Sequence, residues 1–356
     1  MKKILTIVGA RPHFMKSIML SKVLNTSKFK EILVHTGQHY DTNMSKIFFD
    51  ELGIKKEKYN LGINGGSHSE MTAEMMVELE KIILKEKPDL VVVFGDTNST
   101  LAGAIVTSKL NIPLAHIEAG FRSHNRKMPE EINRIVTDHL STFLFCPTPQ
   151  SVKELKNEGI IKNVFFTGDI MYDATVYFSK ASESKKEEIF KKLNLSEHEY
   201  LYCTIHRQAN TESKDKLKSI FDALIESKEK IILPLHPRTY KKLKEFNLYA
   251  ELLNKNIEFI EPISYFESLM LTKYCKKAVT DSGGVLREAY FFKKPCIVLR
   301  DSIEFKESLG ESILVGSNPE KILKNIKCFE GNGKFPSFFG NGNSAKKIVE
   351  ILLKNI

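Results

Sequence analysis

The sequence predicts an α/β protein with two doubly wound parallel sheets and a cleft between the two halves. Two observations support this prediction. Short apolar runs typical of buried strands alternate with stretches of helical periodicity, and this alternation indicates parallel sheets with right-handed crossovers. The chain also has 356 residues, which is too many for one ordinary core and favours two domains.

The first half of the chain alternates strand and helix signals. The run LVVVF is continuously apolar, as expected for a strand in a sheet that is covered on both faces. We expect a glycine-containing loop at 61–69. The predicted strands are 4–8, 32–35, 90–94, 113–117, 143–146 and 164–166. Helices are predicted to end near 24, 52, 85, 109 and 140.

The second half repeats the same plan. Its predicted strands are 200–205, 231–235, 257–260, 278–280 and 296–299, and its helices include 217–227 and 283–292. We place the boundary near Gly168, with an N-terminal domain at 1–168 and a C-terminal, ligand-binding domain at 169–340. The last segment, 341–356, contains a helix that is expected to pack back on the N-terminal domain.

Composition narrows the possible functions. The net charge of +9 arises from 53 Lys and Arg against 44 Asp and Glu, and much of the excess is lysine spread over predicted helix faces. No basic cluster is interleaved with aromatic residues, so we expect an anionic small molecule rather than nucleic acid as the partner. No apolar run has the length of a membrane span, and the start MKKILTIVGARP is a first strand rather than a signal peptide. Five scattered cysteines without a CxxC pair indicate a reducing compartment, so we expect a cytoplasmic protein.

The stretch 112–141 places two carboxylates beside a basic loop. Glu118 follows a predicted strand, and Glu130 follows Pro129 at the start of a predicted helix. Taken singly, such residues are more often helix caps or solvated loop residues. Ligands of open α/β sheets bind outside the carboxyl ends of the strands, however, and carboxylates there can transfer protons.

Other strand ends carry similar polar residues. Two glycines at a helix start allow the backbone to approach a phosphate, and the helix dipole favours an anion there. A carboxylate in the following turns can accept the two hydroxyls of a ribose. The residues concerned are Arg11 and Lys16 after the first strand, Asp96 after 90–94, His206 and His236 after strands of the second half, and Ser282, Gly283, Gly284 and Glu288 around the predicted helix at 283–292.

Several classes of site lack support in the sequence. The histidines do not have metal-ligand spacing, and no cysteine set accompanies them, so we expect no metal. A Walker loop and a GxGxxG fingerprint after the first strand are both missing, so neither ATP nor a nicotinamide cofactor is indicated. No GxSxG elbow indicates a serine hydrolase.

Taken together, the motifs resemble the UDP-N-acetylglucosamine 2-epimerase family over nearly the whole chain. The motifs are GARPHFMK, HTGQHYD, GDTNSTLAG, HIEAGFRS, MPEEINR, TDHLS, the pair His206-Arg207, PLHPR, TDSGG followed by REA, and LRD. The resemblance implies two Rossmann-like domains in the GT-B-like arrangement, a homodimer, and UDP-sugar as substrate without metal or other cofactor.

The resemblance also assigns roles to the residues. It places Arg11, Lys16, Asp96, Glu118, Glu130, Arg134 and His206 around the sugar, and His236, Ser282, Gly283, Gly284 and Glu288 around UDP. The implied reaction eliminates UDP across C1–C2, because C2 carries no strongly acidic proton, and then adds it back to a 2-acetamidoglucal. The catalytic residues would be Asp96, Glu118, Glu130 and His206, and which carboxylate acts on which face of the ring stays open.

Some positions depart from the usual family pattern. Leu286 and Arg287 stand where Gln and an acidic or Lys residue are common, Ala209 where Glu is common, and Ile303-Glu304 where Thr-Glu is usual. The forms GARPxFxK and AGxRSxNRxMPEEINR resemble the branch that also contains epimerases of UDP-2,3-diacetamido-2,3-dideoxy-glucuronate, which is the alternative substrate. A hydrolysing epimerase, a glycosyltransferase and a non-enzymatic UDP-sugar sensor are further alternatives.

Overall fold

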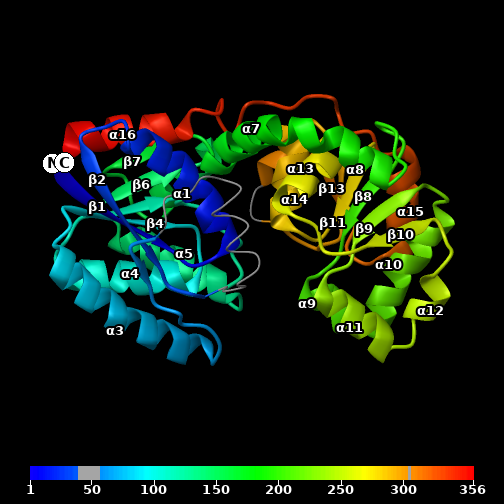
Figure 1. Cartoon of the computed structure of the whole chain (residues 1–356), viewed down its shortest axis with the longest axis horizontal. Coiled ribbons are helices and arrows are strands. Elements are labelled where there is room, and N and C mark those ends of the chain that lie inside the picture. Colours follow the sequence, from blue (N-terminus) through cyan, green and yellow to red (C-terminus); the bar gives the residue numbers. More distant parts are fainter. Residues whose placement is uncertain (39–56, 304–305) are drawn as a thin grey trace. The chain divides into compact units, whose positions relative to one another are not determined.

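The computed structural model describes residues 1–38, 57–303 and 306–356, and it divides into two compact units (Figure 1). Unit 1 comprises Met1–Ala174 and Ser337–Ile356, and unit 2 comprises Thr175–Pro336. Gly168, the expected boundary, lies between the last strand of unit 1 and the following helix. The helix predicted to end near 52 lies outside the described residues. Within them, no helix has the length and apolarity needed to cross a membrane.

Within the described residues of unit 1, seven parallel strands form one sheet in the order β3-β2-β1-β4-β5-β6-β7. Successive strands extend outward in both directions from β1 and β4, so the sheet is doubly wound and its switch point lies between these two strands. The strands are β1 Lys2–Val8, β2 Phe29–His35, β3 Tyr59–Asn60, β4 Leu90–Phe94, β5 Leu114–Ile117, β6 Phe143–Cys146 and β7 Val164–Phe166.

Helices cover both faces of this sheet (Figure 1). Buried side chains of α3 and α4 pack against Leu5, Ile7, Val91 and Val93 on one face. On the other face α1 contacts α16, so the C-terminal helix belongs to unit 1. The helices are α1 Arg11–Leu24, α3 His68–Glu86, α4 Asn98–Lys109, α5 Pro129–Leu140, α6 Pro149–Asn157, α7 Ile170–Ser182, which continues into unit 2, and α16 Ser344–Asn355.

The start of α3 differs from the sequence prediction. The predicted loop extends to 69, but the helix already begins at His68. A capping box explains this start: Ser67 accepts a hydrogen bond from the backbone of Glu70, and the Glu70 side chain accepts one from the backbone of Ser67. Such reciprocal caps satisfy amide groups that would otherwise lack partners, and they initiate a helix before the apolar periodicity begins.

Unit 2 contains a second parallel sheet, with the order β10-β9-β8-β11-β12-β13 among its described strands. This is the strand order 3-2-1-4-5-6 of doubly wound dinucleotide-binding folds, with the switch point between β8 and β11. The strands are β8 Leu201–Thr204, β9 Ile231–Pro234, β10 Ile257–Ile260, β11 Lys277–Thr280, β12 Cys296–Val298 and β13 Ser312–Leu314.

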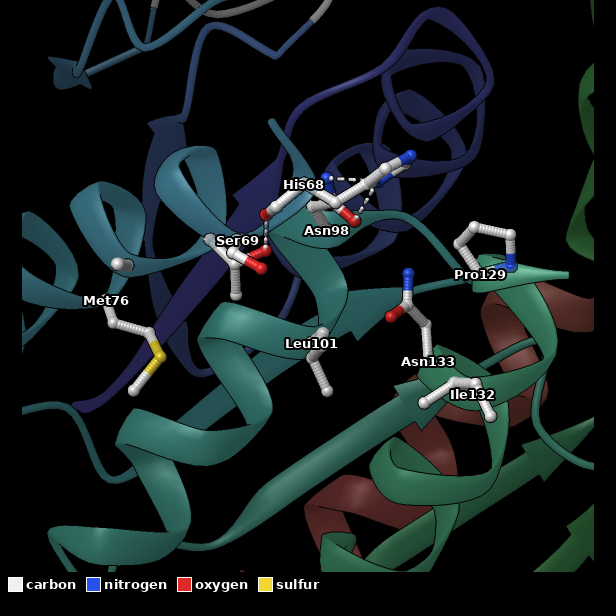
Figure 2. Close-up of a pocket in the computed structure, with 10 residues that line it drawn as sticks. His68, Ser69, Met76, Asn98, Leu101, Pro129, Ile132 and Asn133 are labelled. Atoms are coloured by element: carbon white, nitrogen blue, oxygen red, sulfur yellow. Dashed lines mark hydrogen bonds between the residues drawn. The ribbon is translucent and has the colours of Figure 1, made fainter. Parts of the chain in front are cut away.

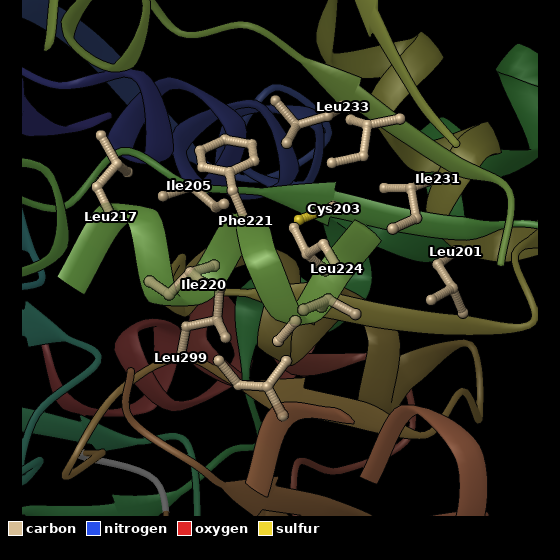
Figure 3. Close-up of a cluster of buried hydrophobic side chains, with 14 of the residues drawn as sticks. Leu201, Cys203, Ile205, Leu217, Ile220, Phe221, Leu224, Ile231, Leu233 and Leu299 are labelled. Atoms are coloured by element: carbon tan, nitrogen blue, oxygen red, sulfur yellow. The ribbon is translucent and has the colours of Figure 1, made fainter. Parts of the chain in front are cut away.

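The helices of unit 2 include α10, whose apolar face forms much of the core (Figure 3). Leu217, Ile220, Phe221 and Leu224 of α10 pack on strand residues such as Cys203. The elements are α8 Lys186–Lys192, α9 Gln208–Thr211, α10 Lys214–Glu226, α11 Pro237–Glu245, α12 Tyr249–Leu252, α13 Tyr265–Tyr274, α14 Gly283–Phe291, α15 Pro319–Cys328 and the short 3-10 turns η1 Glu183–Lys185 and η2 Lys306–Ser308. The predicted fold class, two parallel α/β sheets, is confirmed.

Candidate active site

The switch point of unit 1 brings the ends of β1 and β4 together around two glycines. A Cβ at Gly9 would lie 2.0 Å from Ser99 Oγ, so only glycine fits after β1. Gly95 follows β4 with φ +61, in the left-handed region that favours glycine. A Cβ there would lie 3.4 Å from Lys16 Nζ and 3.6 Å from His13 Nε2. Lys16 of α1 therefore reaches the end of β4, where Asp96 begins the next turn.

Lys16 forms a buried ion pair with Glu118, the residue that follows β5. The exposed fractions of the two side chains are 3% and 11%. Glu118 has φ +76, an uncommon conformation for a residue with a side chain, and its N–H and that of Ala119 both donate to Phe145 O at 3.1 Å. A buried charge requires a partner, so this pair keeps an ammonium and a carboxylate side by side with little access to water.

Arg134 of α5 links a second carboxylate to the same region. Its Nε donates to Asp96 Oδ2 at 2.9 Å, and its Nη1 donates to Glu131 Oε2 at 2.9 Å. Asn133 Nδ2 donates to the backbone carbonyl of Asp96 at 2.8 Å. The Asp96 side chain keeps 30% of its surface exposed, so it is held in position and is still accessible to a ligand.

The adjacent residues Glu130 and Glu131 occupy different environments. Glu130, the predicted catalytic residue, is exposed in the first turn of α5. Glu131 is 1% exposed and accepts hydrogen bonds from the backbone N–H groups of Ser123 and His124 at 2.9 and 2.8 Å. Burial would raise the pKa of Glu131, but these donors and Arg134 outweigh it and lower the pKa. Glu131 therefore holds the basic loop before α5, and Glu130 is the one left open to a ligand.

A pocket of about 420 Å³ lies between α3, α4 and α5 (Figure 2). Its wall combines apolar side chains with the imidazole of His68 and the amide of Asn98. The distance between His68 Nδ1 and Asn98 Nδ2 is 3.1 Å. Asn133 lines the pocket and also bonds the backbone of Asp96. The pocket thus adjoins the turn that carries Asp96.

In unit 2, Asp281 organises the switch point between β8 and β11. It is 0% exposed and accepts the backbone N–H groups of His206 and Arg207 at 3.0 and 2.9 Å and the side-chain amide of Asn210 at 3.0 Å. The Asn210 amide also donates to the backbone carbonyl of Leu299 at 3.0 Å. The buried carboxylate therefore fixes the turn that follows β8.

His206 and His236 stack at the ends of β8 and β9, with ring centroids 5.3 Å apart. His236 caps α11 by accepting the N–H of Arg238 at Nδ1, and Arg238 donates to the carbonyl of His206 at 3.1 Å. Burial lowers the pKa of both imidazoles, and the positive charge of Arg238 lowers both pKa values further. The charge of Asp281 opposes this shift at His206. The pair is therefore neutral near pH 7 and stands beside cations, an environment suited to an anion.

Helix α14 begins beside this pair with Gly283 and Gly284. Ser282 is its N-cap and accepts the N–H of Val285 at 3.4 Å. Among the described residues, a Cβ at Gly284 would meet only Ser282 Oγ, at 3.6 Å, so this part of the chain leaves the space over the helix start open. Glu288, one turn further, is 5% exposed. The amide groups of this helix start can bind a phosphate.

The structure thus gathers the predicted site residues in two sets. Lys16, Asp96, Glu118 and Arg134 meet at the carboxyl edge of the unit 1 sheet, with Glu130 exposed at the start of α5; His206, His236, Ser282, Gly283, Gly284 and Glu288 lie in unit 2. The side chain of Arg11, the first residue of α1, lies outside the described residues. In the described part of the chain, no group of three or more His, Cys, Asp or Glu side chains is placed to hold a metal ion.

Sequence reasoning missed three residues of these sets. Asp281 lies within the TDSGG motif, directly after a strand, and this position was the available signal. Glu131 and Asn133 lie within MPEEINR, but nothing in the sequence distinguishes a buried Glu131 from an exposed Glu130. Which of the two glutamates is buried depends on how α5 packs on α4, and the periodicity of the sequence alone does not specify this packing.

Comparisons with known proteins identify the family. Residues 21–353 match the family model described as UDP-N-acetylglucosamine 2-epimerase. The chain is 52% identical to a UDP-N-acetylglucosamine 2-epimerase homolog of Methanococcus maripaludis, over 98% of this chain and 99% of that protein. It is 43% identical to a UDP-2,3-diacetamido-2,3-dideoxy-D-glucuronate 2-epimerase of Pseudomonas aeruginosa, over 99% of each chain.

A solved structure extends the similarity to the fold. The crystal structure of the Methanocaldococcus jannaschii UDP-GlcNAc 2-epimerase in complex with UDP-GlcNAc and UDP has a TM-score of 0.91 and 45% sequence identity, and the match covers 99% of this chain and all of that one. The resemblance that the motifs indicate is therefore confirmed over nearly the full length. The chain belongs to the UDP-N-acetylglucosamine 2-epimerase family, which is a family of isomerases.

Proposed function

We propose that the protein is a non-hydrolysing 2-epimerase that interconverts UDP-N-acetylglucosamine and UDP-N-acetylmannosamine. The observation that carries this proposal is the pairing of two carboxylates with two cations at one sheet edge, Glu118 with Lys16 and Asp96 with Arg134. A carboxylate beside a cation stays ionised and can accept a proton, and the cation can stabilise the charge that remains after the proton leaves.

The proposed reaction balances as an elimination followed by an addition. A carboxylate removes the proton at C2, the C1–O bond breaks with its electrons leaving on UDP, and a C1=C2 double bond forms in a 2-acetamidoglucal. A proton then returns to C2 on the other face while UDP re-adds at C1. Asp96, Glu118 and Glu130 supply the proton-transfer groups, and Arg11, Arg134 and His206 stabilise the departing diphosphate.

Unit 2 supplies the groups for UDP in this proposal. The start of α14 offers backbone amides to the diphosphate, and the open space above Gly284 leaves room for it. Stacked His206 and His236 add two imidazoles beside Arg238, and Glu288 is the candidate for the ribose hydroxyls. The solved relative in complex with UDP-GlcNAc and UDP supports this choice of ligand.

A second substrate, UDP-2,3-diacetamido-2,3-dideoxy-glucuronate, has its own support. The relative from Pseudomonas aeruginosa that carries this activity in its name matches 99% of the chain. A net charge of +9 also suits a sugar with an additional carboxylate, through the long-range field. The cytoplasmic location, the homodimer and a role in polysaccharide biosynthesis remain predictions from the sequence and its resemblance.

Isotope exchange tests the proposed reaction. Each UDP-sugar is incubated with the enzyme in deuterated water, and the C2 position of both epimers is followed by NMR. We expect deuterium at C2 of both epimers with UDP still attached at C1. Free 2-epimeric sugar with loss of UDP would indicate a hydrolysing enzyme, and UDP release that requires an acceptor would indicate a glycosyltransferase. Absence of C2 label with both UDP-sugars would falsify the epimerase proposal, and the ratio of kcat/KM values identifies the substrate.

A further inference from the structure

A buried polar network touches the backbone turns that carry Asp96 and Glu118. His116 on β5 and Asp138 on α5 are 0% and 1% exposed, and His116 Nδ1 lies 2.6 Å from Asp138 Oδ1. The second ring nitrogen, Nε2, lies 2.8 Å from the carbonyl oxygen of Gly95, which directly precedes Asp96. Asp138 Oδ2 accepts the N–H of Gly120 at 3.1 Å, two residues after Glu118. One side-chain pair is therefore bonded to both turns.

The hydrogen-bond partners of His116 determine its protonation. The carbonyl of Gly95 can only accept, so Nε2 carries a hydrogen. Asp138 Oδ2 accepts from the Arg122 guanidinium at 2.7 Å and from the N–H of Gly120 at 3.1 Å, and these donors favour the ionised carboxylate. An ionised Asp138 is also only an acceptor, so Nδ1 carries a hydrogen as well. These assignments make His116 an imidazolium.

The surrounding charges support this assignment. Arg122, 3% exposed, donates through Nη1 to Asp138 Oδ2 at 2.7 Å and through Nε and Nη2 to the two carboxylate oxygens of Glu158 at 2.7 Å each. Glu158 is also 3.6 Å from His139 Nε2, on the solvent side. On β6, burial and the charge of Asp138 raise the pKa of Cys146, so its thiol is neutral. An imidazolium and a guanidinium then balance two carboxylates, whereas a neutral His116 would leave an excess negative charge.

We propose that His116, held as an imidazolium by Asp138, is a positioning residue for the epimerase reaction. It fixes the carbonyl of Gly95, and its partner Asp138 fixes the N–H of Gly120, so the pair sets the relative placement of Asp96 and Glu118. The left-handed conformation of Glu118, with φ +76, persists because the residues on both sides of it are anchored in this way. Small displacements of catalytic groups cost large factors in rate, which makes such an anchor valuable.

This inference rests on the proposed function, and the Asp138→Asn variant separates the two. An asparagine amide keeps the size of Asp138 but donates to His116 Nδ1, so the ring must become neutral. We expect kcat for C2 exchange to fall on the order of a hundredfold. We expect KM and the stabilisation by UDP to change little, because most of the residues proposed to bind UDP lie in unit 2. Thr137→Val is the matched control, since Thr137 is buried beside Asp138 on the same helix and carries no charge.

The protonation of His116 is measured directly by nitrogen-15 NMR of its ring, without any substrate. The wild-type protein should show two protonated ring nitrogens, and Asp138→Asn should show one. His116→Phe is a second variant that keeps a ring of similar size but removes the donor to the Gly95 carbonyl, and it should show the same loss in kcat. A neutral His116 in the wild-type protein overturns the inference. Wild-type kcat in Asp138→Asn, or an equal loss in Thr137→Val, also overturns it. Absence of C2 exchange in the wild-type enzyme instead rejects the proposed function.

Discussion

The two units share one topology, yet their switch points contain opposite kinds of chemistry. In unit 1 the charges at the sheet edge are already paired, Lys16 with Glu118 and Arg134 with Asp96 and Glu131. In unit 2 the buried carboxylate of Asp281 is satisfied by backbone and amide groups. The neighbouring histidines are neutral, and the described part of the chain leaves the space above Gly284 of α14 open. The difference teaches that the fold supplies only the location of a site. In the proposed function, one edge serves proton transfer and the other binds an anion.

The comparison is tested most strongly by removing the proton function of Glu118. Glu118→Gln keeps the size of the side chain but cannot take up a proton, and we expect kcat to fall by roughly a hundred- to ten-thousand-fold. The thermal shift caused by UDP should persist, because most of the residues proposed to bind UDP lie in unit 2. Glu130→Gln should behave in the same way without loss of stability, since Glu130 is exposed.

Two carboxylates outside the proposed chemistry serve as controls for this experiment. Glu154→Gln changes a carboxylate of α6 that faces His124 and should leave kcat unchanged. Glu131→Gln weakens a buried acceptor of two backbone N–H groups and should lower the unfolding temperature, unlike Glu130→Gln. Full activity in both Glu118→Gln and Glu130→Gln would remove the proton-transfer role from these two residues.

The second prediction concerns the helix start in unit 2. Gly284→Val adds a side chain at a Cβ position that has only Ser282 Oγ within 4 Å among the residues that the structure describes, so the fold should tolerate it. The added methyl groups occupy the space assigned to the diphosphate, so UDP should no longer raise the unfolding temperature. For the wild-type protein, UDP at a hundred times its Kd should add about 2.7 kcal/mol to the free energy of unfolding. A variant that retains the full UDP shift would place the UDP site elsewhere.

The sequence predicts most of this fold because its strand signals are strong. The run at 90–94 is β4 with the same bounds, since a continuous apolar run of that length has few other places to be buried. Strands β3 and β13 were not predicted; they have two and three residues and pair at the sheet edges, where an apolar run is not required. Edge pairing depends on the neighbouring strand more than on the segment itself.

The site was predicted less completely, for a different physical reason. Motifs indicate which residues follow strands, so Asp96, Glu118 and His206 could be chosen as candidates. Whether a polar residue is bonded within the protein or open to a ligand depends on partners far along the chain. His116 and Asp138 are 22 positions apart, and no local pattern relates them.

The third prediction contrasts a closed glycine of unit 1 with the open Gly284 of unit 2. Gly9→Ala would bring a Cβ to 2.0 Å from Ser99 Oγ and 2.5 Å from Thr36 Oγ1, and these two hydroxyls are bonded to each other at 2.8 Å. We expect a loss of about 1–3 kcal/mol in the free energy of unfolding, as is typical of overpacking. Urea unfolding measures it. Gly284→Ala is the control and should lose little, whereas equal losses in the two variants would contradict the contrast.

Ser99→Ala tests whether the hydroxyl contact is the cause of that loss. In the double variant Gly9→Ala with Ser99→Ala, the atom closest to the new Cβ is gone. The double variant should therefore lose less free energy than the sum of the two single variants. Strict additivity would show that the cost of Gly9→Ala arises from another contact.

The smallest expected effect is a pH dependence of unit 2. The pKa of His206 and that of His236 are lowered in the folded protein, chiefly by burial, so the unfolded chain binds more protons than the folded one as the pH falls through the ordinary histidine value. The stability contributed by the neutral pair is present above about pH 6.5 and is lost as the pH falls towards the lowered values. Thermal unfolding between about pH 7.5 and about pH 5.5 should therefore show a falling midpoint. His35, whose pKa burial also lowers, contributes in the same direction.

UDP should reduce this dependence, because a diphosphate beside the two imidazoles favours their charged forms and raises their pKa values again. The stabilisation by UDP is then larger at about pH 5.5 than at about pH 7.5. A double variant, His206→Asn with His236→Asn, is the control. Its unfolding midpoint should still fall with pH, but only by the part that His35 and other groups contribute. If UDP stabilises the wild-type protein equally at both pH values, the histidine pair does not face the diphosphate. The contrast between the two sheet edges would then rest on the start of α14 alone.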